Sequence, residues 1–195
     1  MRLELKIVDL LARNLEKKFT INEVAKVLKE HYSLVHRIVS RLFKKRIISK
    51  EKIGRAYICS LNLDNENTPI LIQLSEADKR DNFLNSDKEL KLILEDFAKS
   101  VESHVNITSI VLFGSYAKRT AIKESDIDIL LISREKAGID KVTREIYAKY
   151  GKEINIIIMT PDDFRKQKHK DLIKEIINNH YIIHGIEKFV DMVYR

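Results

Sequence analysis

Apolar side chains near the N-terminus recur at helical spacing in three successive segments. In residues 3–15, leucine or isoleucine returns every three or four positions, which predicts an amphipathic helix. Thr20 and Glu23 have the spacing of a capping box and predict that a short second helix begins there. Ser33 is expected to cap a third helix that ends near Arg46.

The third segment separates its apolar and polar side chains onto two halves of a helical wheel. The apolar half consists of Leu34, Val35, Ile38, Val39, Leu42 and Phe43. The other half carries Arg37, Ser40, Arg41 and Lys44. Ile47-Ile48 and Ala56–Ser60 then read as two strands, joined by the loop KEKIGR with Gly54 as its turn residue. Three helices followed by a hairpin are therefore expected.

The remainder of the chain alternates helical and strand-like patterns. A weakly patterned helix is expected over 70–84, and a second capping box at Ser86–Glu89 opens another helix. Apolar, β-branched runs predict strands buried on both faces at Thr108–Phe113, Ile127–Ile132 and Ile154–Met159. Helical patterns follow at Lys141–Tyr150 and Asp162–Asn178, then a short strand at Tyr181–Ile183 and a closing helix at Glu187–Tyr194.

The polar run NLDNENTP, residues 62–69, is the best candidate for a domain boundary. We expect a first domain at residues 1–62, a linker with a helix at 63–85, and a second domain at 86–195. The predicted fold class is α+β, with an N-terminal winged helix-turn-helix followed by a mixed-sheet domain.

Charge is distributed unevenly between the two predicted domains. The whole chain has a formal net charge of +7, and residues 1–62 alone carry fifteen Lys and Arg against six Asp and Glu. A basic module suggests an anionic partner such as nucleic acid. No apolar stretch is long enough for a membrane helix, and the single cysteine, Cys59, fits a reducing cytoplasm. We therefore expect a cytoplasmic protein with no membrane partner.

The basic module resembles the winged-helix domains of small prokaryotic transcription regulators. In such domains a helix enters the major groove, and basic side chains on its exposed face contact phosphates and guanine edges. The residues expected to face double-stranded DNA are Ser33, His36, Arg37, Arg41 and Lys44 on the third helix, with Lys52 and Arg55 on the wing. The alternative is a winged helix used for protein contact or dimerisation, and a homodimer is compatible with either use.

Two carboxylates lie at the mouth of a strand that the pattern predicts to be buried. Asp126 and Asp128 are two positions apart, so on a strand they point to the same side. Like charges placed together and desolvated are unfavourable unless a cation pairs with them. Gly114 ends the preceding strand, and the following SYAKRT is expected to form a short helix. Its first N–H groups, together with the Ser115 hydroxyl, would receive an anion. Mg²⁺ suits this arrangement, because it prefers one or two carboxylates together with substrate phosphates.

Gly114-Ser115, ten residues and Asp126-x-Asp128 resemble the signature of the DNA polymerase β-type nucleotidyltransferases, in particular their minimal prokaryotic members. The resemblance covers about residues 86–195. It implies that Asp126 and Asp128 are catalytic and bind metal, and that Gly114 and Ser115 bind the nucleotide. Lys118 or Arg119 would add charge on the phosphate side. It also implies Mg²⁺ and a nucleoside triphosphate, with ATP expected, and transfer of a nucleoside monophosphate to an acceptor that includes proteins in some relatives.

The chain departs from that family at two positions. A third carboxylate normally lies on the next strand, where this sequence has Asn155, and Glu153 could substitute only if the strand is shifted. Arg119 stands where relatives often carry glycine. Two hypotheses therefore stay open: a nucleotidyltransferase, or a non-catalytic DNA-binding regulator that uses the second domain as a nucleotide sensor or dimerisation platform.

Overall fold

A computed structural model describes residues 2–54 and 56–195, and the chain divides into two compact units. The first unit runs to Asp78, and the second runs from Lys79 to Val193. In the described part of the chain, no helix combines the length and the apolar character needed to cross a membrane.

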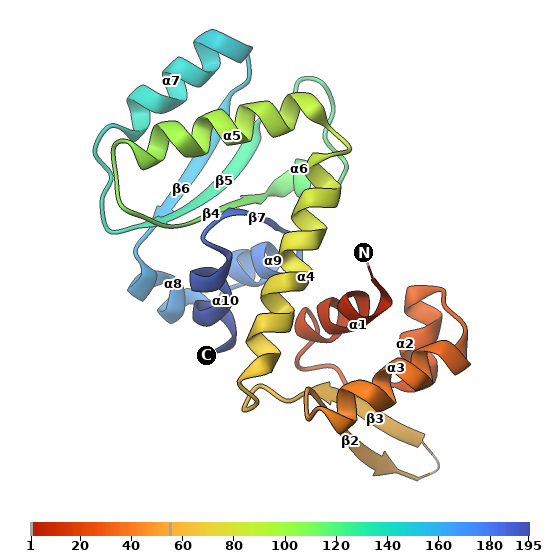
Figure 1. Cartoon of the computed structure of the whole chain (residues 1–195). Coiled ribbons are helices and arrows are strands. Elements are labelled where there is room, and N and C mark those ends of the chain that lie inside the picture. The colour runs from red at the N-terminus through yellow and green to blue at the C-terminus, as the bar shows by residue number, and fades with distance from the viewer. Residues whose placement is uncertain (1, 55) are drawn as a thin grey trace. The chain divides into compact units, whose positions relative to one another are not determined.

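The first unit has the arrangement of a winged helix-turn-helix, as predicted (Figure 1). Its helices are α1 (Leu3–Ala12), α2 (Ile21–Leu28) and α3 (Tyr32–Lys44). Its strands are β1 (Phe19–Thr20), β2 (Ile48–Ile53) and β3 (Ala56–Leu61). They form an antiparallel sheet in the order β1-β3-β2, in which β2 and β3 make the wing hairpin.

Local sequence signals explain most of this unit. Thr20 accepts a hydrogen bond from the backbone of Glu23, and the Glu23 carboxylate accepts one from the backbone of Thr20, so the predicted capping box is confirmed. Helix α3 buries its apolar face through Val35, Ile38, Val39 and Leu42.

Three local predictions in this unit were wrong. Ser33 does not cap α3, because the helix begins at Tyr32, with His31 as its N-cap two residues before Ser33. Phe43 does not join the apolar face: its exposed fraction is 45%, and the Lys50 ammonium lies over its ring. The loop expected at KEKIGR is shorter, because β2 continues to Ile53 and leaves only the turn at Gly54, where φ is +61°.

Helix α4 (Asn67–Leu84) follows the wing and confirms the helix expected over 70–84. It begins inside the polar run of residues 62–69, and Thr68, near its start, donates its hydroxyl to the carbonyl of Asn62. The division between the two units falls within this helix.

The second unit is a four-stranded mixed sheet covered by helices on both faces (Figure 1). The strands are β4 (Ile107–Phe113), β5 (Ile127–Ser133), β6 (Ile154–Met159) and β7 (Tyr181–His184), in the order β6-β5-β4-β7. The pairing of β5 with β6 is parallel, whereas β4 is antiparallel to both of its neighbours. The helices are α5 (Lys88–Glu102), α6 (Gly114–Ala117), α7 (Ile139–Tyr150), α8 (Pro161–Gln167), α9 (Asp171–Asn178) and α10 (Ile186–Tyr194).

All the strands predicted for the second unit are present. Strands β4 and β5 are buried almost throughout, but β6 is an edge strand whose side chains are mostly half-buried. The helical pattern over Asp162–Asn178 forms two helices, α8 and α9. The capping box at Ser86–Glu89 was wrong, because Asp87 is the N-cap of α5 and accepts a hydrogen bond from the Leu90 backbone.

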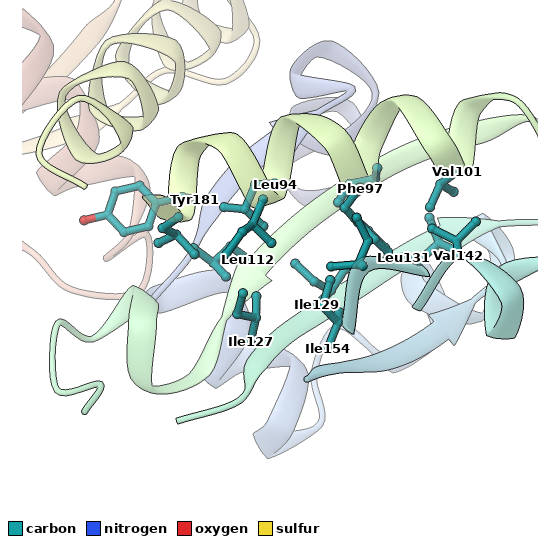
Figure 2. Packing of buried hydrophobic residues seen from close by; sticks show 14 of the residues in the cluster. Leu94, Phe97, Val101, Leu112, Ile127, Ile129, Leu131, Val142, Ile154 and Tyr181 are labelled. Carbon is teal, nitrogen blue, oxygen red and sulfur yellow. The ribbon is translucent and has the colours of Figure 1, made fainter. Parts of the chain in front are cut away.

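The alternation of β5 divides the core into two layers. Ile127, Ile129 and Leu131 pack against α5 and α7, as Figure 2 shows. Leu130 and Ile132 point to the other face and pack with residues of α8, α9 and α10. This alternation determines on which face the carboxylates at the start of β5 lie.

Candidate active site

Gly114 and Asp128 lie next to each other where β4 ends and α6 begins. Phe113 at the end of β4 is paired with Asp128 in the antiparallel register. Gly114 has φ of +69°, and a Cβ atom placed on it would lie 2.0 Å from Oδ2 of Asp128. Both the backbone conformation and the space therefore require glycine at this position.

Asp126 and Asp128 lie on the same face of the sheet. Asp126 directly precedes β5. Asp126 and Asp128 occupy the same alternate positions along the strand as Leu130 and Ile132, so their side chains lie on the face of the sheet covered by α8–α10. Asp126 is exposed and Asp128 is half-buried. Burial raises the pKa of Asp128, and the nearby charge of Asp126 raises it further, while a hydrogen bond from Asn155 opposes the rise. A cation placed between the two carboxylates would relieve this repulsion.

Asn155 occupies the neighbouring position on β6. It is paired with Asp128 in the parallel register, and its Nδ2 donates a hydrogen bond of 3.2 Å to Oδ2 of Asp126. Glu153, the alternative third carboxylate, is exposed just before β6. Among residues 2–54 and 56–195, no group of three or more His, Cys, Asp or Glu side chains is placed to hold a metal. Two carboxylates fit Mg²⁺ when substrate phosphates and water complete its shell.

The side chains predicted to contact the nucleotide phosphates do not all point the same way. Ser115 directly follows Gly114, and its carbonyl accepts the backbone N–H of Thr120 at 2.9 Å. Helix α6 is only four residues long and begins at Gly114, so the helix expected over SYAKRT is shorter and starts earlier. Lys118 lines a small cleft of about 90 Å³ together with Gly114, and its ammonium is paired with Glu175 of α9.

Arg119 points elsewhere. Its backbone has φ of +59°, the left-handed conformation that glycine adopts most readily. Its guanidinium lies 5.6 Å from the centre of the Phe83 ring, at the end of α4. A glycine at this position would adopt the same backbone conformation without strain.

Sequence reasoning missed two side chains near these loops. Glu175 is 57 positions from Lys118, and no local pattern signals their ion pair. Lys152 donates a hydrogen bond of 3.1 Å to the Tyr116 hydroxyl and another to the carbonyl of Lys123. It thereby ties the segment before β6 to the loop that precedes Asp126.

The candidate DNA-contacting residues of the first unit are largely gathered on one helix. Ser33, His36, Arg37, Arg41 and Lys44 are all exposed on α3, and Lys52 is exposed on β2. Arg55 lies outside the described residues. Arg41 donates to Glu4 of α1 at 3.0 Å, so one of these cations is already paired within the unit.

Comparison with known proteins gives a family match over the second unit. The profile of the family described as "Nucleotidyltransferase domain" matches residues 94–187. A Methanocaldococcus jannaschii protein named "Putative protein adenylyltransferase" is 34% identical over 113 residues, which cover 53% of this chain and 77% of that protein.

Two solved structures also show similarity. One, described as a toxin–antitoxin with AMP-PNP, has a TM-score of 0.41 at 14% identity and covers 52% of this chain and 80% of that chain. The other is MepR, described as a transcription regulator of a Staphylococcus aureus multidrug efflux pump, with a TM-score of 0.37 at 17% identity. That match covers 53% of this chain and 78% of the MepR chain.

Proposed function

The chain belongs to the nucleotidyltransferase domain family, and we propose that its second unit transfers a nucleoside monophosphate from a Mg²⁺-bound triphosphate, with ATP as the expected donor, to a protein acceptor. The observation that carries the proposal is the fit of Asp128 into the space left by Gly114, with Asp126 on the same face of the sheet. The relative named as a protein adenylyltransferase supports a protein as the acceptor class.

Each residue has a defined task in this proposal. Asp126 and Asp128 hold Mg²⁺, which when bound neutralises phosphate charge and polarises the reacting phosphoryl group. Gly114 keeps the approach to Asp128 open for the phosphates. Ser115 offers a hydroxyl to the phosphates, and Lys118 offers an ammonium once it is released from Glu175. Asn155 holds Asp126 in place through its amide.

The direct test is transfer of label from nucleotide to protein. The purified full chain is incubated with Mg²⁺, labelled ATP and a lysate of its host, beside the double variant Asp126→Asn/Asp128→Asn. Labelled protein above the level of the double variant is expected, and GTP, CTP and UTP test the donor in parallel. Equal labelling in both samples would reject transfer.

A second candidate function rests on Asn155. Its amide is neutral and cannot accept a proton from an acceptor hydroxyl. Within the part of the chain that the structure describes, no third acidic side chain forms a metal-binding group with Asp126 and Asp128. In this alternative the second unit binds Mg²⁺ and nucleotide as a sensor without turnover. It predicts that the wild-type chain binds ATP but labels nothing, and that Asn155→Asp gains transfer activity. Strong labelling by the wild-type chain would dismiss it.

For the first unit we propose binding to duplex DNA. The support is the exposed basic face of α3 together with a wing that carries Lys52. Binding should weaken steeply with salt, because phosphate contacts release counterions. Insensitivity of DNA binding to Arg37→Ala and Arg41→Ala together would favour a protein-contact role for the same surface. Sedimentation of the full chain with and without DNA tests whether a homodimer forms.

A further inference from the structure

A second cavity lies on the face of the sheet opposite the two aspartates. It has a volume of about 460 Å³ and is lined by Leu90 and Ile93 of α5 and by Tyr116 of α6. Those residues pack with the layer that contains Ile127 and Ile129. Asp126 and Asp128 have the opposite alternation, so this cavity is separate from the candidate active site.

Three cations line the cavity, namely Arg119, Lys123 and Lys152. Within the described part of the chain, none of them forms an ion pair with a carboxylate. Among the described residues, the Lys152 ammonium donates only to neutral oxygens, the Tyr116 hydroxyl and the Lys123 carbonyl. Two acids also line the cavity.

One of those acids is already engaged. Asp87 accepts the Leu90 backbone N–H at 3.0 Å as the N-cap of α5, and Glu89 is exposed on the first turn of that helix. The lining thus holds three cations and two carboxylates, so positive charge exceeds negative charge around the cavity by one. Uncompensated cations grouped beside a concave surface are suited to bind an anion.

Two features constrain Arg119: its backbone conformation and the contact of its guanidinium with the Phe83 ring. Its backbone adopts a left-handed conformation that is unfavourable for a residue with a Cβ atom, as the backbones of Lys29 and Arg46 also do after other helices. Its guanidinium lies over Phe83, whose other neighbour is the Tyr181 ring, stacked at 3.8 Å. The stack holds the guanidinium at the rim of the cavity and leaves its N–H groups without a carboxylate partner.

The apolar part of the lining defines the rest of the ligand. Leu90, Ile93 and Ile122 offer hydrocarbon surface beside the cations. The volume lies within the range of about 300–1,000 Å³ typical of small-molecule sites. We propose that this cavity binds a small organic phosphate of nucleoside monophosphate size, with its phosphate at Arg119 and Lys152 and its body against Leu90 and Ile93. The inference does not depend on the proposed transfer reaction.

Calorimetric titration with AMP as the probe tests the site in the full chain. EDTA is present, so that no metal draws phosphate to Asp126 and Asp128. The variant Arg119→Gly removes the guanidinium while keeping a residue suited to the left-handed backbone. Lys118→Ala is the matched control, because it removes the adjacent cation that faces the other side of the sheet. We expect AMP to bind at least tenfold more weakly to Arg119→Gly and to Lys152→Gln, and within twofold of wild type to Lys118→Ala.

The proposal would be overturned by absence of AMP binding to the wild-type chain or by unchanged binding to Arg119→Gly. Equal weakening in Lys118→Ala or Asp126→Asn/Asp128→Asn would also overturn it. Adenosine and inorganic phosphate separate the two parts of the ligand, and each should bind at least tenfold more weakly than AMP. Adenosine binding as tightly as AMP would contradict the anion site. Labelling of protein by ATP and Mg²⁺ is measured separately, so failure here is distinguishable from failure of the proposed transferase.

Discussion

The carboxylate of Asp128 occupies the space that a side chain at Gly114 would fill, since a Cβ there would lie 2.0 Å from its Oδ2 atom. The signature glycine is therefore tied to the aspartate fourteen positions later by direct contact. This relationship gives the candidate site its sharpest structural test.

Gly114→Ala should destabilise the chain and abolish Mg²⁺-dependent ATP binding. The left-handed backbone alone costs about 1–2 kcal/mol for a residue with a Cβ atom, and displacement of the Asp128 side chain adds to that. Urea unfolding and ATP titration measure the two effects. Gly151→Ala is the control, because its φ is +64° and, apart from its chain neighbours, no described residue has an atom within 4 Å of a Cβ placed there. Equal losses in both variants would show that contact with Asp128 is unimportant.

Glu175→Gln should strengthen Mg²⁺-dependent ATP binding, because it releases the Lys118 ammonium for phosphate. Exposed ion pairs contribute about 1 kcal/mol or less, so a gain of about twofold to fivefold is expected. Lys118→Ala should weaken binding instead. The control is Glu145→Gln, which breaks the exposed pair of Glu145 with Lys141 at 3.7 Å on α7. A gain in that control as well would mean that net charge alone, without Lys118, explains the effect.

Asp128→Asn should make the chain more stable at neutral pH in EDTA. Burial raises the pKa of Asp128, and Asp126 adds to the rise. A carboxyl whose folded pKa is raised favours folding at low pH, and that contribution is lost as pH rises through the folded pKa. The stability advantage of Asp128→Asn should therefore shrink as pH falls from about 7 to about 4. Urea unfolding of both proteins across this range measures it, and an advantage that grows on acidification would contradict the prediction.

Arg37→Ala should weaken duplex DNA binding and reduce the slope of its salt dependence by about one. Arg37 is exposed on α3, whereas Arg41 is paired with Glu4, so Glu4→Gln should strengthen DNA binding by releasing Arg41. Fluorescence anisotropy at several salt concentrations measures both effects. Arg144→Ala, an exposed arginine of α7, is the matched control and should leave the slope unchanged.

Much of the fold could be predicted from the sequence because local signals and burial agree there. The Thr20–Glu23 box starts α2, and the apolar alternation of β5 places Asp126 and Asp128 on one face. The start of α3 could not be predicted in the same way. A cap contributes only about 1 kcal/mol, so the presence of Ser33 does not decide where the helix begins, and the observed N-cap, His31, makes no side-chain capping hydrogen bond.

Contacts between distant segments had no signal in a single sequence. The Lys118–Glu175 pair and the hydrogen bond from Lys152 to Tyr116 depend on how α9 and the start of β6 approach α6. The direction of Arg119 also depends on the left-handed backbone at that residue, which no neighbouring residue type indicates. Side chains on the loops around the candidate site were therefore harder to place than the carboxylates on the strand.

The inner strand β4 pairs with β7, which is synthesised much later in the chain. Its Ser109 hydroxyl donates to the carbonyl of His184 on β7, a residue 75 positions further along the chain. Ribosomes add about 5–20 residues per second, so several seconds pass between synthesis of β4 and arrival of β7. During this interval one edge of a highly apolar strand is open to other chains. Pairing with β5 protects the other edge of β4 earlier, so this edge should stay open to aggregation until β7 has been made.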